Sequence, residues 1–484
     1  MAESFNPISR RRFLQQSSAL GLALAAAGSQ RGETVGNPAR RPNLILILTD
    51  DQRWDTLGCM GNPIIQTPHL DRLAREGIVF DNHFCTTSIC MSSRASIFTG
   101  LYTRSHTIDS FALPLPDDIY AASYPAWLRQ AGYRVGFIGK WGLGGDLPRE
   151  RFDYFEGFTG QGVYFHDING QETHLTRIMG NQAEEFLRGC APNQPFCLSI
   201  STKAPHVQDG DPDPFRYDPV YKDLYRDISI PPPQTADSVY FEKMPEFIRT
   251  SEGRTRWQSR FATPELYQHS VKGYYRLITG VDDMVGRIVA LLEELRLADN
   301  TVILFTSDNG FFLGEHGMAG KWLMHEESIR TPLLVWDPRI KPARRGHRRR
   351  EMTLNIDIAP TLLDLAGLGI PPFIQGRSLV PLLGPEEAGW RKEWFYEHPF
   401  RYEGKIPVSE GIRTARWKYI RYVETDPLFE ELYDLSADPL ETTNLAANPS
   451  CQMTLNTLRF RWRQWREALS AWRLDPDGEW HDPV

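Results

Sequence analysis

Four short runs of apolar residues recur along the chain, each followed by polar or turn-forming residues. A continuous apolar run of this length is typical of a strand that is buried on both faces of a sheet. Segments with helical spacing alternate with these runs, which predicts an α/β fold with a mostly parallel central sheet flanked by helices. The expected strands are residues 44–48, 133–138, 196–201 and 301–306, and the clearest expected helices are residues 67–77, 124–132, 267–297 and 357–367.

Oxygen donors follow the first and the fourth of these strands. Asp50 and Asp51 come after the first strand, and Asp308 and Asn309 come after the fourth. Taken separately, the aspartates could be a helix cap and Asn-Gly a simple turn. Ligands of open α/β sheets gather beyond the carboxyl ends of the strands, and carboxylate and amide oxygens suit Ca²⁺ or Mg²⁺. The two strand ends together therefore favour a metal site.

The second and third strands end at side chains that can carry a charge or transfer a proton. Lys140 follows the second strand and His206 follows the third. A lone lysine is often a surface residue and a lone histidine is often structural. Lys140 is expected on the same rim of the sheet as Asp50 and Asp51. Histidine titrates in the range needed for proton transfer near neutral pH.

Cys90 begins a segment that enters a helix, Cys90-Met91-Ser92-Ser93-Arg94. The free N–H groups and the dipole at a helix N-terminus favour an anion. Arg94, one turn further, adds a planar guanidinium that matches an oxyanion. A buried structural cysteine is the alternative for this residue taken alone, and the strand-end residues are what favour a reactive one.

The segment from Cys90 to Gly100 resembles the signature of the type I sulfatases, Cys/Ser-x-Pro/Ala-x-Arg followed by Thr-Gly. Cys90, Arg94, Thr99 and Gly100 match, whereas Ser92 stands where Pro or Ala is usual. The resemblance implies an alkaline-phosphatase-like fold. It also implies that a formylglycine-generating enzyme oxidises Cys90 to formylglycine, whose hydrate attacks sulfur. The implied metal is one Ca²⁺, held by Asp50, Asp51, Cys90, Asp308 and Asn309.

The same resemblance gives roles to further residues. Lys140 lies in a Gly-Lys-Trp-Gly stretch where the family usually has Gly-Lys-Trp-His, so Gly142 replaces a histidine. Arg94, Lys140 and Lys321 are implied to neutralise the sulfuryl oxygens. His206 and His316 are implied to handle protons. These residues complete the expected catalytic set of Cys90, Arg94, Lys140, His206, His316 and Lys321.

The expected function is a sulfuric ester hydrolase that releases sulfate. By analogy with the family, a sulfated carbohydrate is the first choice of substrate, in keeping with the many aromatic residues, whose faces suit sugar rings. A small aryl sulfate is the second choice. A phosphate or phosphonate ester hydrolase on the same scaffold is an alternative. The other alternative is a non-catalytic protein that binds sulfated glycans through an unmodified Cys90.

The expected organisation is a large domain with a smaller companion. Residues 1–27 fit a twin-arginine signal peptide, which implies the twin-arginine export machinery as a partner and a periplasmic or secreted protein. Residues 28–41 are a linker, residues 42–384 the catalytic domain, and residues 385–484 a C-terminal α+β subdomain with an antiparallel sheet. Residues 208–260 show no hydrophobic period and are expected to be a long irregular insertion that either shapes the pocket or is a surface excursion.

Charge and cysteine content exclude some partners and leave one pairing open. A formal net charge of −7 gives no support for a nucleic-acid partner. The apolar stretch 19–27 is far shorter than the roughly 20 residues of a membrane span, so none is expected in the mature protein. Cys190 and Cys197 could form a disulfide in an oxidising compartment or could both be free thiols.

Overall fold

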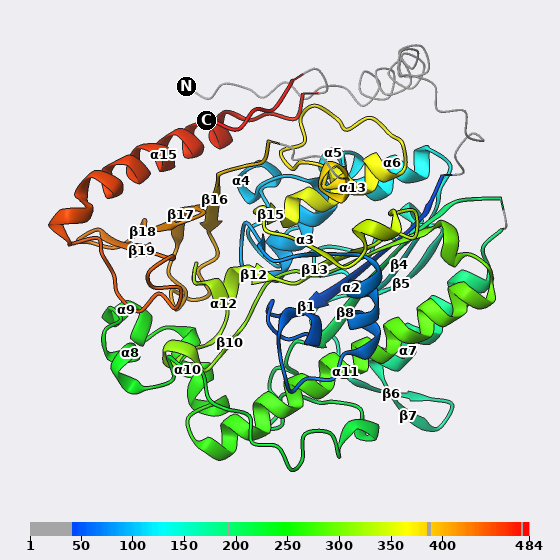
Figure 1. Cartoon of the computed structure of the whole chain (residues 1–484), viewed down its shortest axis with the longest axis horizontal. Coiled ribbons are helices and arrows are strands. Elements are labelled where there is room, and N and C mark those ends of the chain that lie inside the picture. The colour runs from blue at the N-terminus through cyan, green and yellow to red at the C-terminus, as the bar shows by residue number, and fades with distance from the viewer. Residues whose placement is uncertain (1–40, 192, 385–388, 476–477, 484) are drawn as a thin grey trace.

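The computed structural model describes residues 41–191, 193–384, 389–475 and 478–483. The predicted signal peptide and most of the predicted linker lie outside the described residues. A central sheet of eight strands runs through the larger part of the molecule in the order β14-β2-β13-β9-β1-β8-β4-β5 (Figure 1). Its strands are β1 (Asn43–Asp50), β2 (Ile78–Phe80), β4 (Arg134–Lys140), β5 (Tyr154–Phe158), β8 (Phe196–Pro205), β9 (Thr301–Ser307), β13 (Leu333–Trp336) and β14 (His347–Arg349).

The middle of this sheet is parallel, as the sequence predicts. β1 pairs with β8 and β9, and β4 pairs with β8 and β5, all in parallel register. Only β13 runs antiparallel to its neighbours β9 and β2. The carboxyl ends of β1, β4, β8 and β9 therefore lie at one edge of the sheet.

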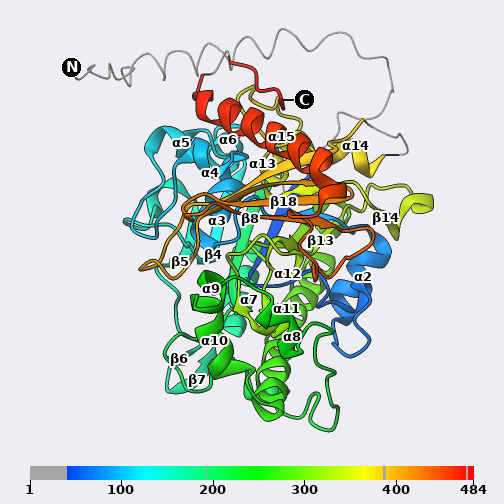
Figure 2. The same cartoon turned by 90° about the vertical axis from the view of Figure 1, so that its left-hand side faces the viewer.

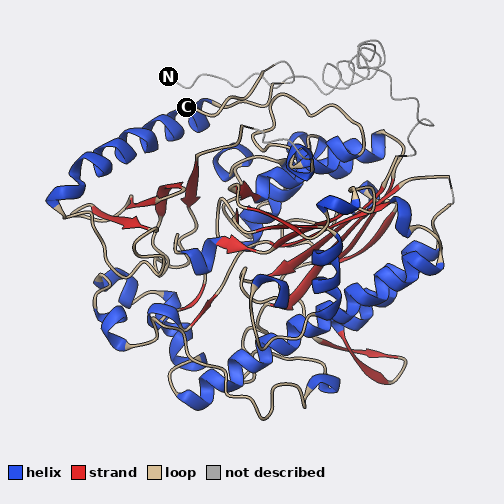
Figure 3. Ribbon diagram, in the orientation of Figure 1, coloured by secondary structure: helices blue, strands red, loops and turns tan. Residues whose placement is uncertain are grey.

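Helices cover both faces of the sheet (Figure 3). α2 (Pro68–Glu76), α7 (Leu175–Arg188) and α11 (Pro264–Glu294) pack on one face. α3 (Cys90–Thr99), α6 (Tyr124–Gln130) and α13 (Ile358–Leu365) pack on the other.

Strand β1 shows why the apolar runs are continuous. Leu44, Leu46 and Leu48 belong to the core under α3, α6 and α13, while Ile45 and Ile47 belong to the core under α7 and α11. Each residue of the strand is thus buried against one helical layer or the other, which removes the polar alternation of a half-exposed strand.

A second, four-stranded antiparallel sheet lies beside the first and matches the antiparallel sheet predicted for the C-terminal region. Its strands are β16 (Glu393–His398), β17 (Ser409–Thr414), β18 (Trp417–Tyr422) and β19 (Phe429–Asp434), in that order. Helix α15 (Gln452–Ala471) lies along this sheet at the edge of the molecule (Figure 2). The core beneath it includes Phe84 and Met324 as well as Trp394 and Trp465, so the subdomain shares a core with the larger part.

The expected irregular insertion is partly helical, which corrects the prediction for its second half. It contains α8 (Ser238–Glu242), α9 (Glu246–Arg249) and α10 (Glu252–Arg260). These helices are too short for a hydrophobic period to be visible in the sequence.

Two further features of the fold are the state of the cysteines and the character of the helices. All six cysteines are free, including Cys190 and Cys197, so the structure has no disulfide between those two. Among the described residues, no helix combines the length and the apolar character needed to cross a lipid bilayer.

Candidate active site

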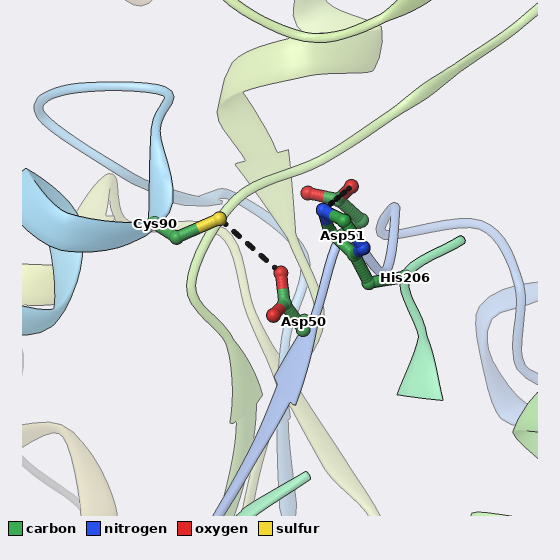
Figure 4. Close-up of side chains that lie close together, drawn as sticks. All are labelled: Asp50, Asp51, Cys90 and His206. Carbon is green, nitrogen blue, oxygen red and sulfur yellow. Dashed lines mark hydrogen bonds and ion pairs between the residues drawn. The ribbon is translucent and has the colours of Figure 1, made fainter. Parts of the chain in front are cut away.

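Asp50, Asp51 and Cys90 meet at the carboxyl end of β1. Asp50 is the last residue of the strand, and Asp51 follows with a φ of 64°, which turns its side chain toward the same space. Cys90 is the first residue of α3, and its Sγ lies 3.4 Å from Oδ1 of Asp50 (Figure 4). All three residues are fully buried or nearly so. The structure therefore brings the predicted nucleophile position to the predicted metal ligands.

The end of β9 completes this group from the neighbouring strand. Oδ1 of Asp308 accepts a hydrogen bond of 3.2 Å from the Asp51 backbone N–H. Nδ2 of Asn309 donates to Oδ1 of Asp51 at 2.7 Å. The Tyr274 hydroxyl, from α11, donates to the backbone carbonyl of Asp51 at 2.6 Å and fixes the turn. All four predicted oxygen ligands thus lie at adjoining strand ends.

Two buried cations hold the carboxylates in place. Nζ of Lys140 contacts Oδ2 of Asp50. Arg94 donates from Nε to Oδ2 of Asp308 at 2.9 Å, and its Nη2 lies 3.4 Å from Asp50. Neither Arg94 nor Lys140 lines the cavity described below, so their charges face the aspartates. Their implied contact with sulfuryl oxygens stays a prediction.

Lys321 has a different position. Its Nζ contacts the Asp51 carboxylate and donates to Sγ of Cys90 at 3.0 Å. Its side chain also lines the cavity. Of the three cations implied by the resemblance, Lys321 is the one that lines this cavity.

Gly142 accounts for one departure from the family pattern. Its φ is 75°, and a Cβ added there would lie 2.5 Å from Cδ of Arg94. The side chain of Arg94, through Cδ and Nε, occupies the space that a side chain at position 142 needs. The other departure, Ser92, is buried and donates a hydrogen bond of 2.7 Å to the carbonyl of Ile108.

The two predicted histidines differ in their placement. Nε2 of His206 lies 3.6 Å from Oδ2 of Asp51 (Figure 4), and Nδ1 faces the Val207 carbonyl at 2.7 Å. His316 instead packs against His325, with ring centroids 5.4 Å apart, and beside Tyr240. Its backbone has a φ of 53°, and the nearby charges are Asp438 and Lys418. The structure therefore does not bring His316 to the group around Cys90.

Burial and neighbouring charges shift the pKa values of this group in opposite directions. Burial works to raise the pKa of Asp50, but Lys140, His206, Arg94 and Lys321 hold it well below its usual range. Burial and the nearby Asp50 raise the pKa of Asp308 to about 6, against the opposing effect of Arg94. Burial and Asp50 raise the pKa of the Cys90 thiol to about 12, so the unmodified side chain is a protonated thiol near neutral pH.

The donor set fits a hard divalent cation. Ligand atoms of Asp50, Asp51, Cys90 and His206 all lie within 4.8 Å of one another. Oδ1 of Asn309 is buried and has no hydrogen-bond partner among the described residues. A buried amide oxygen without a partner is costly, and it adjoins carboxylates of the kind that Ca²⁺ and Mg²⁺ prefer.

A cavity of about 700 Å³ opens over Cys90, His206 and Lys321. Its size is typical of sites for small ligands. Three segments far apart in the sequence form its walls. These segments contribute Ser110, Phe111 and Ala112, then Asp209, Gly210, Glu252, Arg256 and Arg260 of the insertion, and finally Phe400, Tyr402 and Ile406 of the C-terminal part, and Ile89, Gln161 and Trp322 also line the cavity.

Two residues near the site, Gln161 and Lys203, were not predicted from the sequence. Gln161 accepts a hydrogen bond of 2.6 Å from Nζ of Lys140 and lines the cavity. Lys203 donates to the Val207 carbonyl at 2.9 Å and lies over the ring of Tyr164. The only indication of Lys203 in the sequence is its position shortly before the Pro-His pair at the end of β8.

Comparison with known proteins agrees with this geometry. The family model described as Sulfatase matches residues 42–368, which is more than half of the chain. An N-acetylglucosamine-6-O-sulfatase from Bacteroides thetaiotaomicron is 33% identical, over 88% of this chain and 86% of the relative. The chain is a member of the sulfatase family. It is thus a sulfatase by sequence and an α/β protein of the alkaline-phosphatase type by fold.

Further similarities concern the C-terminal part and the solved structures. A second family model, N-sulphoglucosamine sulphohydrolase C-terminal, matches residues 314–468 of this sulfatase. A protein solved in complex with its substrate D-glucosamine-2-N,6-O-disulfate superposes with a TM-score of 0.79 at 28% identity, covering 91% of this chain and all of that one. A phosphonate monoester hydrolase of Agrobacterium radiobacter superposes with a TM-score of 0.70 at 25% identity, covering 89% of this chain and 96% of that one.

Proposed function

We propose that this sulfatase hydrolyses the 6-O-sulfate ester of a glucosamine-type sugar. The observation that supports it most is the position of Cys90, His206 and Lys321 in one cavity, directly over the carboxylates at the ends of β1 and β9. The similarity to an N-acetylglucosamine-6-O-sulfatase, and to a protein whose substrate is a glucosamine disulfate, favours this sugar and this position of the ester.

The proposal includes two groups that the chain acquires. Cys90 would be oxidised to formylglycine by a maturation enzyme, and one Ca²⁺ would be held by Asp50, Asp51, Asp308, Asn309 and the modified residue 90. When present, the formylglycine hydrate supplies an oxygen nucleophile and the cation supplies Lewis acidity. The proposed twin-arginine signal and periplasmic or secreted location suit such a protein.

The side chains of the chain itself would have separate tasks. Lys321 reaches the reacting position from the cavity and would neutralise charge on the sulfuryl oxygens as the bond to the alcohol breaks. Arg94 and Lys140 would keep Asp308 and Asp50 ionised and oriented. Because Nδ1 of His206 donates to the Val207 carbonyl, its Nε2 is directed at the site and can accept a proton.

Two measurements test the proposal. The first is the mass of the peptide spanning Cys90 after coexpression with a formylglycine-generating enzyme, where replacement of CH₂SH by CHO is expected. The second is sulfate release from N-acetylglucosamine-6-O-sulfate, with the Cys90→Ala variant as a control. An unmodified thiol together with tight binding of sulfated glycans would instead support a binding protein.

The phosphonate monoester hydrolase neighbour gives the alternative enzyme a specific basis. Matched sulfate, phosphate and phosphonate monoesters of one alcohol separate the two activities. A value of kcat/KM that is higher for the phosphonate than for the sulfate would contradict the sulfatase proposal. An aryl sulfate assayed beside the sugar sulfate tests whether the enzyme requires a sugar as the alcohol part of the ester.

A further inference from the structure

Arg260 differs from the other buried arginines of this protein. Its side chain is only 7% exposed, yet among the described residues its guanidinium donates no hydrogen bond and forms no ion pair, and Nη1 is fully buried. Every other buried arginine in the described ranges binds a carboxylate or backbone carbonyls. These are Arg53, Arg94, Arg276, Arg391 and Arg413.

The charge on Arg260 is retained in this environment. Burial lowers the pKa of Arg260 to about 10, so the side chain remains a cation near neutral pH. A buried cation without a partner is strongly unfavourable, and proteins normally pair it. Its planar fork is suited to the oxygens of a sulfate or a carboxylate.

The acidic side chains nearby do not supply this partner. Glu252 is bound by Nε of Arg256 at 2.8 Å. Asp209 lies 3.9 Å from Arg256 and forms no ion pair with Arg260. Arg256 also lies over the ring of Trp322, 5.0 Å from its centroid, which fixes it beside Arg260 on the same wall.

Arg260 lies where two cavities meet. It is the last residue of α10 and lines the cavity that contains Cys90 and Lys321. It also lines a second cavity of about 370 Å³, formed by residues 208–212, Pro214 and Ser259. An anion on Arg260 can therefore be part of the same bound molecule as the ester at Cys90.

We propose that Arg260, with Arg256 beside it, forms a second anion subsite that binds a sulfate or carboxylate group of the substrate other than the ester being hydrolysed. This inference rests on the proposed function and narrows it, because the preferred substrate then carries at least two anionic groups. The subsite would act on recognition of the substrate, away from the reacting atoms.

The test compares three substrates and four forms of the mature enzyme. The substrates are N-acetylglucosamine-6-O-sulfate, glucosamine-2-N,6-O-disulfate, and a 6-O-sulfated N-acetylglucosamine linked to a hexuronate. The forms are the wild type, Arg260→Met, Arg260→Lys and Arg249→Met. Arg249 is an exposed arginine of the same insertion that does not line the cavity, and its variant is the matched control.

The expected readout is the preference, the ratio of kcat/KM for a dianionic substrate to that for the monosulfate. Arg260→Met should lower this ratio at least tenfold, mainly through KM. Arg260→Lys should restore part of it, and Arg249→Met should leave it unchanged. The dianionic substrate that shows the preference identifies the group as sulfate or carboxylate. A ratio unchanged by Arg260→Met for both dianionic substrates, or lowered equally by Arg249→Met, would overturn the subsite.

A binding measurement separates this result from failure of the proposed function. If the wild type with an aldehyde at position 90 releases sulfate from no substrate, the function fails. The subsite is then tested by calorimetry on the Cys90→Ala protein with each dianionic sugar. Weakening of at least tenfold for either sugar by Arg260→Met supports the subsite, and equal affinity for both sugars with and without Arg260 refutes it.

Discussion

Nζ of Lys321 lies 3.0 Å from Sγ of Cys90 and at the same time contacts the carboxylate of Asp51. One ammonium group therefore connects the nucleophile position with the proposed metal ligands. Lys321 comes from the segment after β9 and Cys90 from the start of α3, so this contact depends on the whole fold of the larger part.

Replacing Lys321 with methionine should reduce kcat by about 10²–10³-fold, because a cation aimed at developing charge acts mainly on the transition state. KM should change much less. Rates must be normalised to the fraction of aldehyde at position 90, since Lys321 touches Cys90 and the variant could affect maturation. Lys243→Met, at an exposed lysine, is the control. If kcat of Lys321→Met stays within about threefold of the wild-type value, as is expected for the control, Lys321 does not have this role.

Gly142→Ala should destabilise the protein by about 2–3 kcal/mol, from the left-handed backbone and the contact with Arg94 together. Gly160→Ala is a matched control, since its φ is 64° but no atom lies within 4 Å of the added Cβ. The control should cost only about 1–2 kcal/mol, and should leave activity intact. Equilibrium unfolding in denaturant and sulfate release measure the two effects. If Gly142→Ala and Gly160→Ala lose the same free energy of unfolding, the side chain of Arg94 moves aside without a loss of stability.

Chelation should lower both activity and thermal stability, and added Ca²⁺ should restore them. A ligand at 100 times its Kd stabilises the folded state by about 2.7 kcal/mol. The shift in melting temperature on adding Ca²⁺ should shrink in Asn309→Ala, because this variant removes the unpartnered buried oxygen. Calorimetry with Ca²⁺ and with Mg²⁺ on the chelated protein identifies the preferred ion. If neither the chelator nor added Ca²⁺ changes the melting temperature, the proposed metal site is excluded.

Stability should fall as the pH drops below 6.5, and His106 is one cause. Burial lowers its pKa to about 3, and its Nδ1 accepts from the backbone N–H of Ile108. The folded state keeps this histidine neutral while the unfolded chain binds a proton below pH 6.5. The stability contributed by His106 is therefore present above pH 6.5 and is lost as the pH falls toward 3, by about 2 kcal/mol at pH 5.

His106→Gln should accordingly make the decline in unfolding free energy between pH 7.5 and pH 5 shallower by about that amount. His166→Gln, at an exposed histidine, provides the comparison. Denaturant unfolding at the two pH values gives the slope for each protein. An unchanged slope in His106→Gln would mean that other groups dominate acid destabilisation.

Asp50 and Asp308 illustrate what could be predicted from the sequence. Each follows a strongly apolar strand, and the carboxyl ends of neighbouring parallel strands must meet at one edge. Local pattern therefore predicts their proximity without knowledge of the loops. The position of Cys90 follows less directly, and the resemblance to the sulfatase signature was needed for it.

Arg260 and His316 illustrate the opposite. Whether Arg260 reaches the cavity depends on how the insertion folds over it, and no local period encodes that path. His316 is close to Lys321 in the sequence, but its left-handed backbone conformation directs the ring to His325. For Arg94 the sequence does not separate two roles, because binding a carboxylate and binding a sulfate make the same demand on a guanidinium. In the structure Arg94 binds Asp308.

The backbone N–H of Glu252 donates to the carbonyl of Lys405 at 3.0 Å, which joins the insertion to the C-terminal part beside the cavity. The proposed catalytic residues lie at the strand ends, whereas much of the cavity wall is formed by the insertion and the C-terminal part, which meet beside it. The preferred sugar, charge pattern or chain length of the ester can therefore change through those segments, while the proposed catalytic residues at the strand ends stay the same.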